Sequence, residues 1–238
     1  MLTTLSREAA AYGVRLTPVQ MRQFETYLAL LTDWSKRVNL VGNVEAEVVQ
    51  RRHFLESAAL VALLHQEGLT LRDRSLIDVG SGSGIPGIPL KIIEPSLQLT
   101  LVEAKQRKSE FLLAVLPEIG LSDVTVITRR AEEAGHDPRH REQYDFAVAK
   151  ALAPLRTLAE LTLPLVRMGG LVLAPKGKGA ENEVKEARTA LETLKGTVRS
   201  IEPLPLSSPP QTVIIIDKEL PTPQRFPRRP GIPAKRPL

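Results

Sequence analysis

The spacing of hydrophobic residues changes about a third of the way along the chain. In the first part, apolar side chains recur every three or four positions, which indicates helices that bury one face. Thr17 and Pro18 match a helix N-cap followed by proline at the first helical position, and Phe24 and Leu31 then fall on one face. A second apolar face begins at Phe54. The first part is therefore predicted to be helical.

From Ser75 onward, short apolar and β-branched runs alternate with helical segments. The runs are SLIDVG, LQLTLVEA, DVTVIT, YDFAVAK, GGLVLAP, VRSIEPL and QTVIIID. This alternation is typical of an open, mostly parallel sheet. The predicted intervening helices are 86–93, 105–116, 154–166 and 181–195, the last with Gly196 as its C-cap. No helix-length segment separates the last two runs, so we expect an antiparallel pair at one edge of the sheet.

The C-terminal stretch PTPQRFPRRPGIPAKRPL differs from both parts. It begins at Pro221 and holds six of the 19 prolines, so we expect an extended arm that forms no helix. Six basic residues stand against one acid from Lys218 to the C-terminus, and the rest of the chain carries 26 of each sign. A neutral body with a basic tail indicates a polyanion as partner, with a solubilising tail as the alternative.

Composition narrows the chemistry. The 238 residues include no cysteine, which excludes disulfides, thiolate nucleophiles and cysteine metal sites, and the four histidines are scattered. The N-terminus lacks a basic region followed by an apolar block, and no apolar window is long enough for a membrane span. We therefore expect a cytoplasmic protein with no metal and no membrane contact.

The motif LIDVGSGSGIPGIPL raises the question of its ligand. Gly82, Gly84 and Gly87 satisfy the G-x-G-x-x-G pattern of dinucleotide sites. Asp78, however, would place a negative charge beside a pyrophosphate, which is unfavourable. S-adenosylmethionine carries a sulfonium and an ammonium group, so the same carboxylate becomes attractive. Gly80, Gly82 and Gly84 would let the backbone approach the methionine portion.

Two further positions suit an adenosyl ligand. Glu103 ends the second predicted strand, about 20 residues beyond the glycine loop, where a carboxylate accepts both ribose hydroxyls. A solvated strand-end glutamate is the alternative. Ala131 and Glu132 follow the third strand, where a backbone amide and an acidic side chain would contact adenine, and an ordinary exposed glutamate is equally compatible with the pattern.

Several motifs resemble one family across nearly the whole chain. They are HFLES, LIDVGSGSGIPGIPL, LVEAKQRKSEFL, RAEEA, AVAKALAPL and RFPRRPGIPAKRPL. They resemble the bacterial small-subunit rRNA methyltransferase G family, also called glucose-inhibited division protein B. The resemblance implies a class I S-adenosylmethionine-dependent methyltransferase with an α/β, Rossmann-like fold. Its seven-stranded sheet has an antiparallel edge pair, and a helical extension precedes the sheet at the N-terminus. It also implies methylation of N7 of guanine 527 in the decoding region of 16S rRNA, with S-adenosylhomocysteine as product.

The resemblance assigns regions and site residues as well. It implies a helical extension over 1–70, a methyltransferase domain over 71–220 and a basic arm over 221–238. The implied cofactor positions, together with those from the glycine motif, are Asp78, Gly80, Gly82, Gly84, Ile85, Glu103, Ala104, Lys105, Ala131, Glu132 and Lys150. Lys150 is also the implied residue at the reaction centre. Family members often have arginine at this position. Lysine keeps the positive charge but cannot form the bidentate hydrogen bonds of arginine.

The residue types favour N7 chemistry. The absence of cysteine excludes the usual route to cytosine C5, and no Asn/Asp-Pro-Pro-aromatic turn for amine methylation follows the fourth strand. Guanine N7 presents a lone pair with no proton to lose, so alignment and exclusion of water suffice, and Lys150 would act as a hydrogen-bond donor. Three alternative functions stay open. They are methyl transfer to a ribose 2′-hydroxyl assisted by Lys150 and Lys176, a nucleotide-dependent oxidoreductase, and an RNA-binding module without activity.

Basic residues outside the motif predict an RNA surface. Lys105, Arg107 and Lys108 crowd the start of a predicted helix, where the macrodipole disfavours cations unless a polyanion lies nearby. The residues predicted to contact RNA are Arg51, Arg52, His53, Arg107, Lys108, Lys176, Arg225, Arg228, Arg229, Lys235 and Arg236. The expected partner is 16S rRNA in a 30S particle or an assembly intermediate, bound by a monomer.

Overall fold

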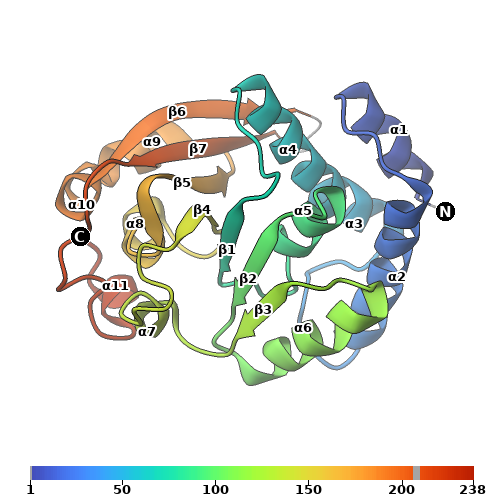
Figure 1. Ribbon diagram of the computed structural model, residues 1–238, viewed down its shortest axis with the longest axis horizontal. Helices are drawn as coiled ribbons and strands as arrows, with labels where there is room; N and C mark the ends of the chain where they lie inside the picture. The colour runs from blue at the N-terminus through green and yellow to red at the C-terminus, as the bar shows by residue number, and fades with distance from the viewer. Residues whose placement is uncertain (1, 206–209) are drawn as a thin grey trace.

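Seven strands form one mixed sheet in the order β3-β2-β1-β4-β5-β7-β6 in the computed structural model, which describes residues 2–205 and 210–238 (Figure 1). The strands are β1 (Ser75–Val79), β2 (Gln98–Val102), β3 (Val124–Ile127), β4 (Tyr144–Val148), β5 (Val166–Lys176), β6 (Gly196–Leu204) and β7 (Gln211–Lys218). Neighbouring strands among β1 to β5 pair in parallel, whereas β7 is antiparallel to both β5 and β6. The predicted antiparallel edge pair is confirmed.

The helices flank this sheet. They are α1 (Thr3–Ala11), α2 (Pro18–Ser35), α3 (Ala46–Val49), the π-helical segment η1 (Gln50–Leu55), α4 (Glu56–Gln66), α5 (Gly87–Ile93), α6 (Gln106–Ile119), α7 (Ala131–Ala134), α8 (Leu155–Thr162), α9 (Ala180–Glu186), α10 (Arg188–Leu194) and α11 (Ile232–Lys235). The predicted helix over 181–195 is two helices that meet at Ala187. Helix α11 lies in the stretch expected to form no helix, so that expectation is wrong.

The predicted C-cap of α10 at Gly196 is also wrong. Lys195, not Gly196, takes the left-handed conformation that ends the helix, with φ of 66°. Gly196 opens β6, where a Cβ atom would lie 2.7 Å from Leu163 Cδ1. The glycine is therefore required for close packing and not for the helix cap.

Helix α2 begins with the predicted capping chemistry. The Thr17 hydroxyl accepts a hydrogen bond from the Gln20 backbone N–H, and the Gln20 side chain accepts one from the Thr17 backbone N–H at 2.8 Å. The Gln20 amide group also donates to the carbonyls of Ile92 and Ile93 at the end of α5. Helix α2 is thus tied to the helix that follows the glycine loop.

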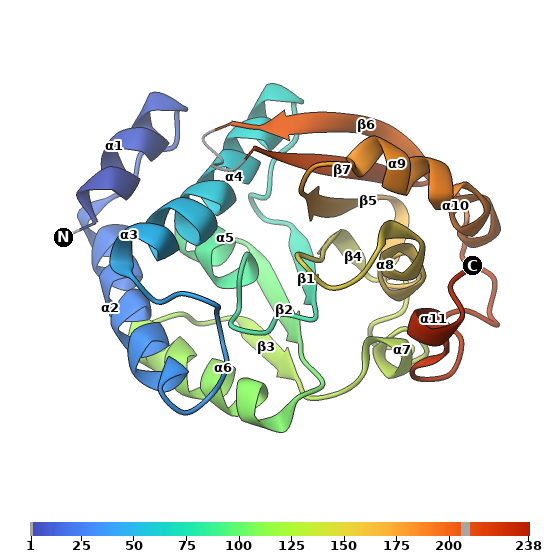
Figure 2. The same cartoon turned by 180° about the vertical axis from the view of Figure 1, so that it is seen from behind.

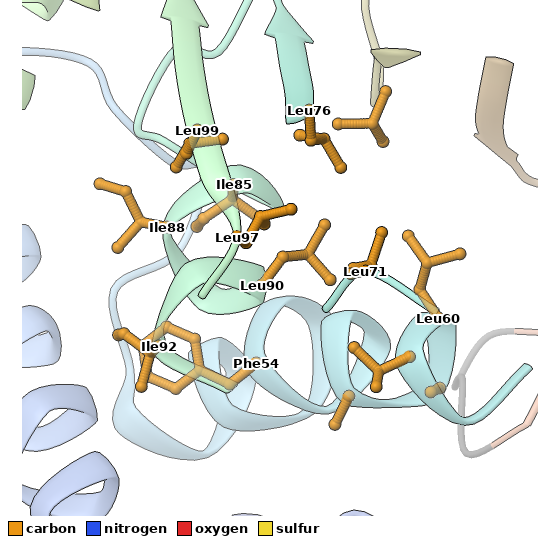
Figure 3. Close-up of a cluster of buried hydrophobic side chains, with 14 of the residues drawn as sticks. Phe54, Leu60, Leu71, Leu76, Ile85, Ile88, Leu90, Ile92, Leu97 and Leu99 are labelled. Carbon is orange, nitrogen blue, oxygen red and sulfur yellow. The ribbon is translucent and has the colours of Figure 1, made fainter. Parts of the chain in front are cut away.

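Two hydrophobic layers enclose the sheet because neighbouring strand residues point to opposite faces. Leu76 of β1 packs with α1 to α6, whereas Ile77 packs with α8 to α10 on the other face (Figures 1 and 2). Figure 3 shows part of the first layer, which joins Phe54 and Leu60 of the helices before β1 to Ile88 of α5 and Leu76 of β1 in one cluster. The helices before β1 therefore share their core with the sheet.

Candidate functional site

The loop between β1 and α5 depends on glycine. Gly80, Gly82 and Gly84 all have positive φ, at 73°, 59° and 86°. The Gly80 backbone N–H donates to the Val102 carbonyl at 2.9 Å, which fastens the loop to the end of β2. A Cβ atom at Gly80 would lie 2.5 Å from Leu152 Cδ1. Other residues are therefore excluded at this position by both conformation and space.

A cavity of about 460 Å³ lies beside this loop at the carboxyl ends of β1 and β2, the usual place for a ligand in a parallel sheet. The predicted residues that line it are Gly80, Gly82, Glu103, Ala104, Lys105, Lys108, Ala131 and Glu132. The structure therefore brings together the glycine loop, the predicted ribose acceptor and the predicted adenine contacts, although they come from three different strand ends.

Glu103 is held rigidly on the wall of this cavity. Its side chain is 7% exposed, Oε2 accepts a hydrogen bond from the Gly82 N–H at 2.9 Å, and Oε1 accepts one from the Lys105 N–H at 2.7 Å. Each carboxylate oxygen keeps a second lone pair. This fixed pair of acceptors, on a wall that Gly80 and Gly82 also line, fits the ribose of S-adenosylmethionine.

Asp78 lies on the other side of the loop. It is 1% exposed, and Oδ2 accepts a hydrogen bond from the Gly87 N–H at the start of α5 at 2.9 Å. Val79 lines the cavity, and because side chains alternate along a strand, Asp78 does not. Burial, and to a smaller degree Glu103, raises the pKa of Asp78 to about 7. Gly84 and Ile85, also predicted to bind the cofactor, do not line the cavity either.

A second cavity, of about 990 Å³, adjoins the first. The two share Ala151, Leu152 and Ala153, which follow β4. Lys150, Lys176 and Arg52 line the larger cavity, together with the acids Glu56, Glu183 and Glu186. Lys150 is therefore placed beside the shared wall and away from the lining of the smaller cavity, whereas it was predicted to contact the cofactor.

Both lysines of the larger cavity are paired. Lys150 Nζ lies 2.5 Å from Glu56 Oε2 and donates to the Arg52 carbonyl at 2.8 Å. Lys176 Nζ lies 2.8 Å from Glu183 Oε2 and also donates to the Ala153 carbonyl. Neither Glu56 nor Glu183 was predicted as a site residue. The signal for Glu56 was an acid inside the apolar run FLESAALVALL, which needs a buried partner.

The predicted cluster Arg51-Arg52-His53 does not act as one group. Arg51 points away from the larger cavity and pairs with Glu8 and Glu47, whereas Arg52 and His53 line it. Burial, then the nearby Lys150 charge, lowers the pKa of His53 to about 4. His53 is therefore neutral near pH 7, so it would meet an RNA in the larger cavity as a neutral imidazole.

The other predicted cations divide into exposed and buried groups. Those at the start of α6 lie on the surface, with Lys105 and Lys108 on the rim of the smaller cavity and Arg107 beside them. The exposed cations of the C-terminal stretch are Arg225, Arg229, Lys235 and Arg236. Arg228 instead forms a bidentate ion pair with Glu160, which is 0% exposed. Its guanidinium group neutralises a buried acid, so Arg228 has a structural role whether or not it also contacts RNA.

The expected extended arm is also wrong. Phe226 is 4% exposed and belongs to the hydrophobic layer of α8 and α10. Arg141 donates hydrogen bonds to the carbonyls of Thr222 and Phe226, which fastens the stretch to the body. The prolines and Phe226 are structural here.

Among residues 2–205 and 210–238, no group of three or more His, Asp or Glu side chains is arranged to hold a metal ion. Within the same ranges, none of the helices combines the length and apolar character needed to cross a membrane.

Comparison with known proteins agrees with this site. A family model described as rRNA small subunit methyltransferase G matches residues 20–208. The ribosomal RNA small subunit methyltransferase G of Roseiflexus sp. (strain RS-1) is 46% identical over 98% of this chain and 98% of its own length. The protein of the same name from Dehalococcoides mccartyi (strain BAV1) is 43% identical over 96% of each. A precorrin-6y C5,15-methyltransferase structure from Geobacter metallireducens, at 15% identity and a TM-score of 0.50 over 76% of this chain and 91% of that one, shares the fold.

Proposed function

Because the chain belongs to the rRNA small subunit methyltransferase G family, we propose that it methylates N7 of guanine 527 in 16S rRNA. The observation that carries this proposal is the pair of adjoining cavities that share the wall Ala151 to Ala153. The smaller cavity suits an adenosyl cofactor. The larger one, lined by lysine–glutamate pairs and Arg52, offers hydrogen-bond donors and acceptors to a nucleotide of an RNA chain. The RNA would be presented in a 30S particle or an assembly intermediate.

The smaller cavity holds S-adenosylmethionine in this proposal. Glu103 accepts the ribose hydroxyls, and the loop at Gly80 and Gly82 lets the ligand approach the backbone. Ala131 lines the same cavity at the end of β3, where the adenine would lie. The bound cofactor supplies the methyl group, and S-adenosylhomocysteine is the product.

In the larger cavity, this chain's residues orient the guanine. Lys150 and Glu56 together offer a donor next to an acceptor. That arrangement is complementary to the guanine edge, which presents O6 as an acceptor next to the N1–H donor. The N7 atom needs no deprotonation, so the residues have only to align it and exclude water.

The pairing of the lysines bears on the alternative reaction. Methylation of a ribose 2′-hydroxyl requires removal of a proton, for which a free amine is the obvious base here. Lys150 is paired with Glu56, and Lys176 is paired with Glu183. Neither lysine is a free amine, which favours N7 over the ribose.

The test uses 30S subunits from cells that lack this protein. We expect the purified protein to transfer label from S-adenosylmethionine to one guanine, and borohydride reduction followed by aniline to cleave the RNA there, as 7-methylguanosine does. The same reaction with fully modified subunits is the control and should take up no label. Label on a ribose, or at an exocyclic amine, would contradict the proposal.

A further inference from the structure

We propose that residues 221–238, the C-terminal segment, form the adenine-side wall of the cofactor cavity and hold the bound cofactor. The inference rests on the proposed function for the identity of the ligand. Its basis is that Gly231, Pro233 and Ala234 line the smaller cavity, in which Ala131 and Glu132 also lie. Figures 1 and 2 both show α11 beside α7, the helix that Ala131 begins.

A buried ion pair fixes the segment in place. Arg228 donates to both carboxylate oxygens of Glu160, at 2.9 and 2.7 Å from Nε and Nη2, and its backbone N–H donates to Oε1 at 2.8 Å. Glu160 belongs to α8 and is 0% exposed, so this carboxylate has no access to water and depends on Arg228. The segment is therefore anchored to α8 just before it reaches the cavity.

A second set of contacts holds the part that faces the cavity. Thr157 of α8 donates its hydroxyl hydrogen to the Pro233 carbonyl at 3.0 Å. The Gly231 backbone N–H donates to Glu132 Oε1 at 2.8 Å, and Gly231 has φ of 83°. Glu132, predicted to contact adenine, thus fastens the segment to α7. Pro233 and Ala234 are held where an adenine ring in the cavity would touch them.

The test exploits two adjacent residues of α11. Ala234 and Lys235 are both exposed, but only Ala234 lines the cavity. We expect Ala234→Trp to weaken S-adenosylmethionine binding at least about tenfold in calorimetry, because the indole ring would occupy the adenine side. Lys235→Trp is the matched control and should bind the cofactor as the wild type does. Thermal unfolding without ligand should be the same in all three proteins.

The outcomes separate this inference from the proposed function. Equal affinity of Ala234→Trp and Lys235→Trp for the cofactor would overturn the inference while leaving the function in place. A wild-type protein that does not bind S-adenosylmethionine would instead overturn the function. If Ala234→Trp lowers the melting temperature, Ala234→Leu provides the second measurement: a smaller loss of affinity with unchanged melting supports the wall, and unchanged affinity contradicts it.

Discussion

Asp78 and Glu103 are both buried carboxylates at the ends of neighbouring strands, but they serve the site differently. Glu103 accepts two backbone N–H groups and lines the cavity. Asp78 accepts one N–H group behind the loop, and its Oδ1 is buried with no hydrogen-bond partner among the described residues. Glu103 is therefore positioned to bind a ligand. Asp78 instead supports the start of α5, and its negative charge is unfavourable because one carboxylate oxygen is buried without a partner.

This difference predicts a pH dependence of stability. The folded-state pKa of Asp78, about 7, lies above the ordinary aspartate value of 3.8, so the stabilisation from its neutral form is complete below about pH 4. It is lost as the pH rises through about 7. We expect the advantage of the wild type over Asp78→Asn, measured as free energy of unfolding in urea without ligand, to shrink from pH 4 to pH 8. Asp73→Asn, at an exposed aspartate, is the control for the exchange itself. An advantage over Asp78→Asn that stays the same from pH 4 to pH 8 would contradict the prediction.

Glu103 permits a prediction about binding. Glu103→Ala should weaken S-adenosylmethionine binding by about 1.5 to 3 kcal/mol, the range for losing hydrogen bonds to a charged group. Glu103→Gln, which keeps one acceptor oxygen, should lose less. Glu110→Ala, exposed on α6, is the control for both. Calorimetry measures the three affinities, and wild-type affinity in Glu103→Ala would place the ribose elsewhere.

Lys150 should separate turnover from cofactor affinity. It lines the larger cavity and not the smaller one, so Lys150→Ala should reduce the rate of methyl transfer more than it changes S-adenosylmethionine binding. The substitution leaves Glu56 buried without its partner, so the unfolding of the variant must be measured beside its activity. An equal loss of S-adenosylmethionine affinity and of turnover in a folded variant would show that Lys150 does not act on the RNA.

At the scale of elements, α2 supports the glycine loop from behind. Tyr27 of α2 is fully buried and donates its hydroxyl hydrogen to the Ser83 carbonyl at 2.5 Å. Tyr27→Phe should therefore lower the free energy of unfolding by about 1 to 3 kcal/mol, because a buried carbonyl loses its donor. Tyr12→Phe, on a partly exposed residue after α1, should change it little. Equal unfolding energies in urea for both variants would show that the loop does not depend on α2.

The elements also show what local patterns could predict. All seven strands were found from short apolar and β-branched runs. The runs are clearest in β1, β2 and β4, which are buried on both faces, whereas β3 and β6 are partly exposed. Helices α7 and α11 were missed, since four residues are too few for a periodic pattern. The walls of the cofactor cavity could be predicted because sequence motifs mark the strand ends that form them. The contacts of Glu132 and Glu56 could not be predicted, because each depends on a partner more than 90 residues away.

At the scale of the whole molecule, the C-terminal segment shows the limit of composition. Its prolines and charges suggested a free arm. Proline has no backbone N–H, however, so a proline-rich segment can also pack on the protein surface with few backbone donors left unpaired. The deciding feature was Glu160, a fully buried acid of the amphipathic helix α8, which Arg228 neutralises. Deleting the segment should therefore destabilise the body, and its role in RNA binding must be tested by substitution.

The remaining tail cations permit that test without disturbing the fold. Arg225, Arg229, Lys235 and Arg236 are exposed, so replacing all four with alanine should leave cofactor affinity and thermal unfolding nearly unchanged. Each lost phosphate contact reduces the slope of log K against log salt by about 0.7 to 0.9, so the four together should reduce its magnitude by up to about 3.6. The measurement is a salt titration of binding to 30S subunits. Replacing Arg7, Lys36, Arg188 and Lys195, four cations remote from the cavities, is the control; equal slopes for the two quadruple variants would show that the RNA does not lie along the C-terminal segment.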